Sequence, residues 1–353
     1  MLIYLTVKMK KILLIICLIF VLLVVYQLAV YFMSISKQDK VKVEPFLAFG
    51  NDKEVFFKGR VIKAYTQRRP SSKNNWLGNI LSSIKRYSGS SVPNAKVEIT
   101  FQEKSYSVST DEDGVFELHI VDSQPNLQND EIVTFKVLEP TTRKTPIAHR
   151  EVRRYAGQIG IISDIDDTII ISHSTEIGKK FWLSISKNAY TRRPLPGVSE
   201  FYKKLTENGK LPIFYVSSSD WSLFDLVNDF LRFRHLPEGP ILLKDKHINL
   251  RNVWKSGQGD HTHKLDKIEL IMEMYPEMQF YLIGDSGQHD PELYAEIIQK
   301  YPGRIKDVFI RLVGELGDER RAKIENLASF EHFHFIETSE EAIKIAERES
   351  IIH

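Results

Sequence analysis

The stretch Ile161-Ile-Ser-Asp164-Ile-Asp166-Asp167-Thr168 decides the fold, because a short apolar run leads directly into a group of carboxylates. Carboxylates crowded together at a buried site repel one another strongly unless a cation neutralises them. Mg²⁺ is the expected cation, since it prefers oxygen ligands and often binds protein carboxylates together with phosphate groups. A solvated acidic turn is the alternative, and it is disfavoured because the acids follow a strand that is apolar enough to be central and buried.

Strand patterns alternate with helical patterns on both sides of this stretch, from Gln158 to the C-terminus. The strands are predicted at 159–163, 212–216, 279–283, 308–313 and 332–337, and the helices at 199–208, 221–235, 263–275, 291–301, 317–329 and 339–350. This alternation predicts an α/β domain over residues 151–353, with a parallel Rossmann-like sheet flanked by helices on both faces. Functional residues in such folds gather at the carboxyl ends of the strands.

Polar side chains follow at further strand ends and helix starts. Ser217 and Ser218 end the second predicted strand, where a hydroxyl can bind a phosphoryl oxygen. Lys264 opens a helix and offers a positive charge to a transferring phosphoryl group. Each signal is weak alone, since serine runs are common in loops and most lysines lie at the surface.

A second acidic segment, Gly284-Asp285-Ser-Gly-Gln-His-Asp290-Pro-Glu-Leu-Tyr294, follows the third predicted strand. Gly284 allows a close approach of the backbone, and Asp285 leaves the strand as a candidate metal ligand. Asp290 and Pro291 are expected to start the next helix as its cap and first residue. Asp290 therefore has a structural role open to it besides metal binding.

The order of these motifs resembles that of the haloacid-dehalogenase-like phosphatases: Asp-x-Asp-x-Thr, a strand-end Ser, a Lys and Gly-Asp-x-x-x-x-Asp. The strings "SDIDDTI", "PLPGV", "FYVSSSDW" and "GDSGQHDPELY" resemble one branch more closely, the catalytic domain of the actin-patch-type phosphatidate phosphatases, over roughly residues 155–315. Asp220 departs from this pattern, since the family usually has Pro there. A membrane anchor is a second departure. Both bear on the physiological substrate more than on the chemistry.

The resemblance implies three catalytic residues. Asp164 would be the nucleophile that attacks phosphorus and forms an aspartyl-phosphate, which divides one difficult displacement into two easier steps. Asp166 would protonate the leaving alkoxide and then activate water. Lys264 would offset the negative charge on the nucleophile and the transition state.

The resemblance also implies the residues that bind phosphate and metal. Thr168 would hold the turn that aims the acids, and Ser217, with Ser218 beside it, would hydrogen-bond the phosphoryl oxygens. Mg²⁺ would be bound by the carboxylates of Asp164 and Asp285 and by the backbone carbonyl of Asp166. Asp290 would support the metal or the lysine.

Residues 53–150 have a different pattern, in which apolar and polar side chains alternate as in half-buried strands. The strands are predicted at 58–65, 95–101, 105–109, 115–120 and 132–137. Their spacing predicts a small antiparallel β-sandwich, and "NAKVEI" with "TDEDGVF" loosely resembles the transthyretin-like or carboxypeptidase-regulatory-like accessory domains. The acidic residues 111–113 favour a hairpin turn over a calcium loop, because EF-hand spacing is absent.

The composition excludes several classes of protein. The chain has 353 residues and a formal net charge of +2, which argues against a protein that covers nucleic-acid phosphates, so no nucleic-acid partner is expected. The single cysteine, Cys17, excludes an intrachain disulfide and a Cys₄ zinc site. An oxygen-ligated metal remains compatible with this composition.

Residues 1–34 are predicted to be a single-pass N-terminal membrane anchor, followed by a polar linker over residues 35–52. The apolar run Ile12–Phe32 spans roughly 30 Å as a helix, the thickness of a hydrocarbon core. A cleavable signal peptide is the alternative, but the run is longer than its usual apolar region and no small-x-small site follows. Lysines flank the run equally, so its orientation stays open, as does the choice of Met1 or Met9 as start.

Basic and aromatic side chains occur in two further segments. Residues 171–194 lie where this superfamily carries an insertion over the site, and they either contact an anionic headgroup or form a packed flap. Residues 68–91 either lie on anionic lipid or form an ordinary loop helix. His261 and His263 have the spacing of a zinc pair, but no other Cys or His nearby completes a site.

The leading hypothesis is a Mg²⁺-dependent phosphatidate phosphatase acting on a phospholipid at the membrane surface. One alternative is a phosphatase of the same superfamily that acts on a soluble phosphomonoester or a phosphoprotein. Another is a membrane-tethered adaptor without activity, which the presence of Asp164, Asp166 and Asp285 disfavours. The protein partner of the β-sandwich and the oligomeric state are not predicted.

Overall fold

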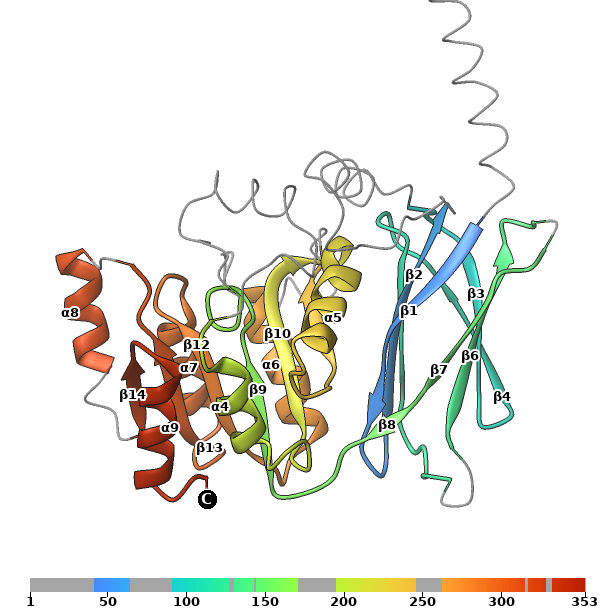
Figure 1. Ribbon diagram of the computed structural model, residues 1–353. Coiled ribbons are helices and arrows are strands. Elements are labelled where there is room, and N and C mark those ends of the chain that lie inside the picture. The colour runs from blue at the N-terminus through green and yellow to red at the C-terminus, as the bar shows by residue number, and fades with distance from the viewer. Residues whose placement is uncertain are drawn as a thin grey trace, which may run out of the picture.

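The computed structural model describes residues 41–63, 91–126, 130–142, 144–170, 195–245, 262–314, 317–327 and 332–352. It contains three sheets: two of four strands that precede one of six strands (Figure 1). The predicted membrane anchor, most of segment 68–91, the whole of segment 171–194 and His261 lie outside these ranges. Among the described helices, none combines the length and the apolar character that crossing a membrane requires.

The six-stranded sheet is entirely parallel, as the alternation of strands and helices predicted. Its strands, in spatial order, are β11 (Ile241–Lys244), β10 (Ile213–Asp220), β9 (Ile159–Ser163), β12 (Gln279–Asp285), β13 (Ile305–Arg311) and β14 (Phe333–Ile336). Strand β9 is central, and the chain continues to β10 on one side and later to β12 on the other. Such a point of reversed strand order opens a crevice at the carboxyl ends of the strands.

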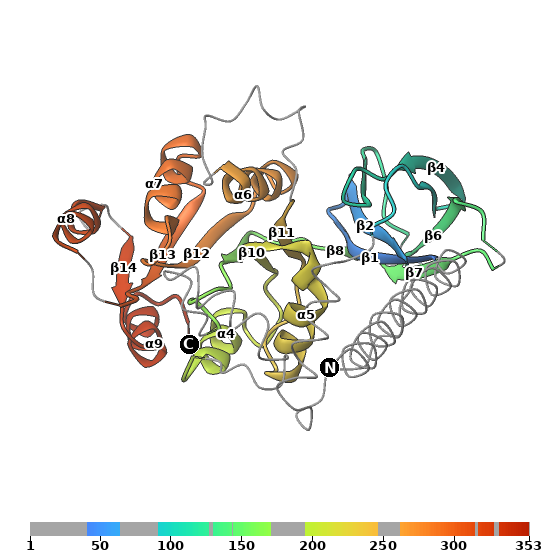
Figure 2. The ribbon, with the colours of Figure 1, turned by 90° about the horizontal axis from the view of Figure 1, so that it is seen from above.

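Helices cover both faces of this sheet (Figure 2). One face carries α6 (Thr262–Met274) and α7 (Asp290–Lys300), and the other carries α4 (Val198–Leu205), α5 (Phe224–Phe233) and α9 (Ser339–Arg348). Helix α8 (Asp318–Leu327) lies beyond β14, and a short 3₁₀ turn (Trp221–Leu223) precedes α5. In α4 the side chains of Val198, Phe201, Tyr202 and Leu205 are buried at helical spacing, so its apolar stripe faces the sheet.

The two four-stranded sheets form a sandwich. One contains β5 (Val115–Ile120), β2 (Val55–Lys63), β1 (Val41–Gly50) and β8 (Arg153–Arg154), and the other contains β4 (Lys104–Ser109), β3 (Lys96–Phe101), β6 (Ile132–Glu139) and β7 (Ile147–Glu151). All pairs are antiparallel except β1 with β8. Aromatic rings from both sheets meet between them: the centroid of Phe57 lies 5.2 Å from that of Phe101 and 6.2 Å from that of Phe135.

Four strands were not predicted. Residues 35–52 were expected to be a linker, but Val41–Gly50 is strand β1, which pairs with β2 along its length. β1 is apolar on both sides: Val43 and Ala48 lie in the sandwich core, while Phe46 and Phe49 lie in the core of the parallel sheet. The expected alternation of apolar and polar residues was therefore absent. Strands β7, β8 and β11 are short and show no alternation of apolar and polar residues.

The sandwich packs against the parallel-sheet domain through β1. The Phe46 ring stacks on Trp221 with centroids 4.9 Å apart and lies 4.7 Å from Phe224. The Tyr275 hydroxyl donates to the Gly50 carbonyl at 2.9 Å. Aromatic packing of this kind adds to the stabilisation from burial, so the two domains share one continuous apolar contact.

Candidate active site

The candidate site lies at the carboxyl edge of the parallel sheet, where β9 ends between β10 and β12. Asp164 directly follows β9 and Asp285 ends β12. Asp290 begins α7, and Lys264 lies in the first turn of α6. These side chains come from segments as far as 126 residues apart, and the parallel strands bring them to one edge as predicted.

Lys264 joins two of the buried carboxylates. Its ammonium group donates to Asp164 Oδ1 at 2.8 Å and also forms an ion pair with Asp290. Lys264 is 5% exposed, Asp164 0% and Asp290 1%. Burial lowers the pKa of Lys264, but the charges of Asp164, Asp290 and Asp285 outweigh this and raise it. The lysine therefore stays positive in the site.

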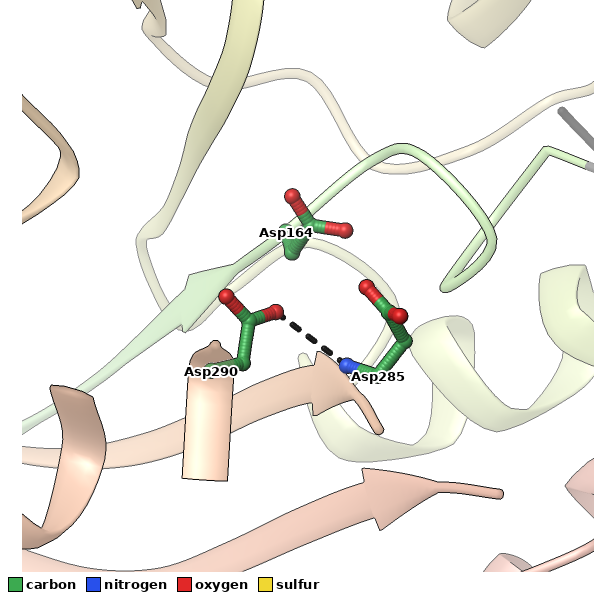
Figure 3. Close-up of side chains that lie close together, drawn as sticks. All are labelled: Asp164, Asp285 and Asp290. Carbon is green, nitrogen blue, oxygen red and sulfur yellow. Dashed lines mark hydrogen bonds between the residues drawn. The ribbon is translucent and has the colours of Figure 1, made fainter. Parts of the chain in front are cut away.

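Asp290 also fixes the end of β12. The Asp285 backbone N–H donates to Asp290 Oδ2 at 3.1 Å (Figure 3). A Cβ added at Gly284 would meet that same oxygen at 2.5 Å, so only glycine permits this approach. Asp290 was expected to cap α7, but the helix begins at Asp290 and its cap position is His289. Its side chain serves the site instead.

Asp285 is held by the turn that follows it. Its Oδ1 accepts hydrogen bonds from the backbone N–H groups of Gly287 at 2.7 Å and Gln288 at 3.0 Å, and its Oδ2 accepts from the Gln288 side chain at 3.3 Å. Tyr294 donates through its hydroxyl to the Ile283 carbonyl at 2.9 Å, which anchors α7 to β12. The carboxylate is thus oriented by its surroundings, and Asp285 itself is 0% exposed.

The carboxylates of Asp164, Asp285 and Asp290 form a compact buried cluster (Figure 3). One oxygen from each lies within 4.8 Å of the other two. Burial, with the repulsion of Asp290 and Asp166, raises the pKa of Asp164 to about 7 against the attraction of Lys264. Burial, followed by the charges of Asp290 and Asp164, raises the pKa of Asp285 well above its ordinary value. One lysine does not balance three carboxylates, and this cluster is suited to a cation.

The hydrogen bonding of Asp164 leaves one oxygen for a substrate or a cation. Its Oδ1 is occupied by Lys264, whereas its Oδ2 is buried and accepts no hydrogen bond from the described residues. A buried carboxylate oxygen without a partner is costly unless a ligand or metal satisfies it. The donor set consists of carboxylate oxygens alone, which matches the preference of Mg²⁺. The residues present therefore fit a hard divalent cation.

Asp166 has a different environment from the one expected. Its Oδ2 accepts hydrogen bonds from the hydroxyls of Ser217 at 3.0 Å and Ser219 at 2.6 Å. Ser217 Oγ in turn accepts from the Ser219 backbone N–H at 2.9 Å. The Asp166 carboxylate is thus held by β10 and lies outside the three-carboxylate cluster. Its proposed metal contact was through its backbone carbonyl, so it stays a prediction.

Three residues that were expected to bind phosphate lie near this edge of the sheet, and their environments differ. Ser217 is buried and bonded to Asp166 rather than exposed to a ligand. Thr168 is buried and its hydroxyl has no hydrogen-bond partner, so the backbone alone closes the turn, with Ile169 N–H donating to the Ile165 carbonyl at 2.9 Å. Ser218 is half-buried. Phosphate binding by these residues remains a prediction.

Ser219 was missed by the sequence analysis. It lies two residues after Ser217, and alternate residues of a strand face the same side. Extending the predicted strand beyond residue 216 would have placed both hydroxyls toward Asp166. The serine run itself indicated this arrangement, but the predicted strand ended at residue 216, before the serines.

A buried ion network from the sandwich lies beside the site. Lys58 of β2, which is 3% exposed, places its ammonium group 2.7 Å from Asp245 Oδ1 and 3.2 Å from Glu117 Oε2. Asp245 also accepts from the Trp221 indole at 2.8 Å and from Lys267 at 2.6 Å. Lys267 lies one turn after Lys264 on α6. The accessory domain therefore contacts the helix that carries a site lysine.

Comparison with known proteins agrees with this geometry. Residues 159–312 match the family described as the catalytic domain of phosphatidate phosphatase APP1. This match confirms the resemblance found in the motifs. The finding covers the parallel-sheet domain without its last strand and helices.

Two curated relatives are similar to part of this chain. Phosphatidate phosphatase APP1 of Saccharomyces cerevisiae is 31% identical over 153 residues, covering 43% of this chain and 26% of the yeast protein. An uncharacterized protein of Schizosaccharomyces pombe is 27% identical over 177 residues, covering 50% of this chain and 28% of that protein. The chain thus spans about a quarter of the length of these relatives. A solved structure of a Pnkp1/Rnl/Hen1 complex is similar at a TM-score of 0.31 with 14% identity, covering 51% of this chain and 57% of that one.

Proposed function

We propose that this protein is a Mg²⁺-dependent phosphatidate phosphatase, which hydrolyses phosphatidate to diacylglycerol and phosphate through an aspartyl-phosphate. The observation that carries this proposal is the buried Asp164 carboxylate, which has one oxygen bonded to Lys264 and the other without a partner. The match of residues 159–312 to the APP1 catalytic-domain family supports the same reaction class.

The first step uses the unpartnered oxygen of Asp164. Lys264 holds Oδ1 at 2.8 Å and thereby orients the carboxylate with Oδ2 available for attack. Attack of this oxygen on phosphorus forms the acyl-phosphate bond and breaks the bond between phosphorus and the glycerol oxygen. The positive charge of Lys264 lies against the carboxylate as the phosphoryl group approaches, which offsets the charge of the transition state.

Asp166 moves the protons in both steps. It gives a proton to the departing glycerol oxygen, which leaves as the hydroxyl of diacylglycerol. It then accepts a proton from the water that attacks phosphorus, and phosphate leaves as Asp164 is regenerated. The hydroxyls of Ser217 and Ser219 hold one oxygen of Asp166, which fixes the position of the carboxylate.

Asp164 and Asp285 would hold the Mg²⁺, with Asp290 as the third member of the cluster. The ion would neutralise the phosphoryl oxygens and so allow an anionic nucleophile to approach an anionic substrate. The buried position and raised pKa of Asp164 and Asp285 support a cation at this place. Other hard divalent cations, above all Mn²⁺, have similar ligand preferences.

The lipid substrate rests on the family and on the predicted anchor. The S. cerevisiae relative is a phosphatidate phosphatase by name, and an apolar N-terminal helix would keep the catalytic domain at a bilayer. A soluble phosphomonoester or a phosphoprotein is the alternative substrate.

The test measures phosphate release by the full chain from phosphatidate in mixed micelles, with Mg²⁺ or with EDTA. Wild type is expected to be active only with Mg²⁺, and Asp164→Asn is expected to be inactive. Asp318→Asn, an exposed carboxylate in the first turn of α8, is the matched control and should be fully active. Activity of Asp164→Asn would overturn the mechanism. Activity on glycerol 3-phosphate or a phosphopeptide, with none on phosphatidate, would overturn the lipid substrate.

A further inference from the structure

A cavity lies between the sandwich and the parallel-sheet domain, at the edge of the sheet opposite the site. Its volume is about 340 Å³. The sandwich contributes residues of β1, β7 and β8, and the other domain contributes α5 and the segment before β11. Figure 2 shows β8 and β11 close together at this junction. Ile241 begins β11, so the cavity meets the amino end of the strand, whereas Asp164 and Asp285 follow carboxyl ends.

Three arginines line this cavity: Arg150 of β7, Arg153 of β8 and Arg232 of α5. Arg153 is neutralised, because its guanidinium lies 2.6 Å from Glu238 Oε2. Glu151 is the other acidic residue of the lining. Three arginines against two glutamates leave a formal excess of positive charge in a confined space.

Arg150 carries most of this excess. Its side chain is half-buried, and its one hydrogen bond in the described structure goes from Nη1 to the Pro45 carbonyl at 3.0 Å. No acidic side chain of the described ranges forms an ion pair with it. Burial, and then the charge of Arg153, lower the pKa of Arg150. A guanidinium has five N–H donors, so several remain available.

Arg232 faces the same cavity from the other domain. It lies in the last turn of α5, is exposed and forms no ion pair within the described part of the chain. Asn228, one turn earlier, also lines the cavity and adds an amide. Donors from two domains therefore line one space. A half-buried guanidinium without a carboxylate partner, such as that of Arg150, favours an anion beside it.

We propose that this cavity binds a small soluble anion with a phosphate or carboxylate group, held by Arg150 and Arg232. Guanidinium groups match the paired oxygens of both anions, and their bonds to charged acceptors are short and strong. A volume of about 340 Å³ is at the lower end of ligand sites, which suits a small molecule better than an acylated lipid. Leu47, Leu231 and Leu236 supply an apolar wall beside the charged groups.

Binding here would link the two domains. The anion would contact β7 on one side and α5 on the other, so it would stabilise the packed arrangement relative to the separated one. The midpoint of unfolding should then rise with the logarithm of the anion concentration. The proposal does not depend on the reaction proposed above, because its readout is binding at a different edge of the sheet.

The test measures binding of inorganic phosphate and of succinate to the full chain by calorimetry, in EDTA. Wild type is compared with Arg150→Met and Arg232→Gln. Arg232 is exposed, so its variant is expected to fold even if the half-buried Arg150 is needed for folding. The matched control is Arg348→Met, since the Arg348 side chain is 70% exposed and pairs only with its neighbour Glu349 at 3.1 Å.

Wild type is expected to bind at least one probe. Each of the two variants is expected to bind that probe at least about tenfold more weakly, which corresponds to a loss of about 1.4 kcal/mol in binding free energy. Arg348→Met should bind as wild type does. The proposal is overturned if wild type binds neither probe, or if Arg232→Gln and every folded Arg150 variant bind as tightly as wild type. If the two arginine variants no longer sediment with phosphatidate vesicles but still bind the soluble probes, the cavity binds a lipid headgroup, and the proposal is overturned.

Discussion

Gly284→Ala tests whether the close approach of Asp290 to β12 is needed for the chemistry. The new Cβ would lie 2.5 Å from Asp290 Oδ2, 2.7 Å from its Cβ and 2.9 Å from its Cγ. Ordinary contact begins near 3.4 Å, so the carboxylate must retreat by about 0.9 Å. It has little freedom to do so, because Lys264 and the Asp285 N–H both hold it and it is 1% exposed.

The expected effect has two parts. Overpacking of a buried site costs about 1–3 kcal/mol, which urea unfolding of the full chain measures. A misplacement of about 1 Å costs up to roughly 100-fold in rate, so kcat for phosphatidate should fall by one to two orders of magnitude. Gly317→Ala is the control, since nothing lies within 4 Å of the Cβ it would add. Wild-type kcat and stability for Gly284→Ala would refute the argument that Asp290 must stay where it is.

Three further predictions follow from the buried charges. Because burial raises the pKa of Asp164 from 3.8 to about 7, the free energy of unfolding of the metal-free protein should fall as pH rises through this range, and Mg²⁺ should stabilise the protein more above pH 7 than below it. The same pH dependence of the free energy of unfolding for wild type and Asp164→Asn, measured by urea unfolding, would contradict this. Ser219→Ala removes a hydrogen bond to the Asp166 carboxylate that is worth about 1.5–3 kcal/mol, so kcat should fall about 10- to 100-fold with KM nearly unchanged. A change confined to KM would contradict this role of Ser219. Lys58→Met removes the ion pair of the buried Lys58 with Asp245 and should lower the free energy of unfolding in urea by about 3 kcal/mol. Lys136→Met, at an exposed ion pair, should lower it by less than about 1 kcal/mol, and equal losses would show that burial does not matter here.

The parallel domain was predictable because its signals are local and repeated. Strand β9 was predicted with the bounds it has, and the six predicted helices all exist, with ends shifted by three residues or fewer. Strand β1 was missed because it has two apolar faces, one toward each domain, and no alternation marks it. Strand β11 is the short run Ile-Leu-Leu-Lys, in which apolar and polar residues do not alternate.

The site was predictable in its members and less so in its contacts. The order of motifs placed Asp164, Lys264 and Asp285 at one edge, and the structure brings them together. The partner of each side chain depends on register across strands, which a sequence does not contain. Ser217 was therefore expected on the phosphate and is found on Asp166. Asp290, which was expected to support the metal or the lysine, pairs with Lys264 and lies in the carboxylate cluster.

The least predictable feature is the contact of the sandwich with both ends of α6. At the amino end, Lys58 reaches Asp245, which in turn bonds Lys267, three residues after Lys264. At the carboxyl end, the Asn51 amide donates to the Met274 carbonyl. A helix fixed at both ends cannot rotate or slide without breaking one of these contacts, and Lys264 is aimed at Asp164 only for one rotation of α6. The accessory domain therefore affects the position of Lys264 through its contacts with α6. A catalytic domain cut at residue 159 would lose these contacts while keeping every residue of the site.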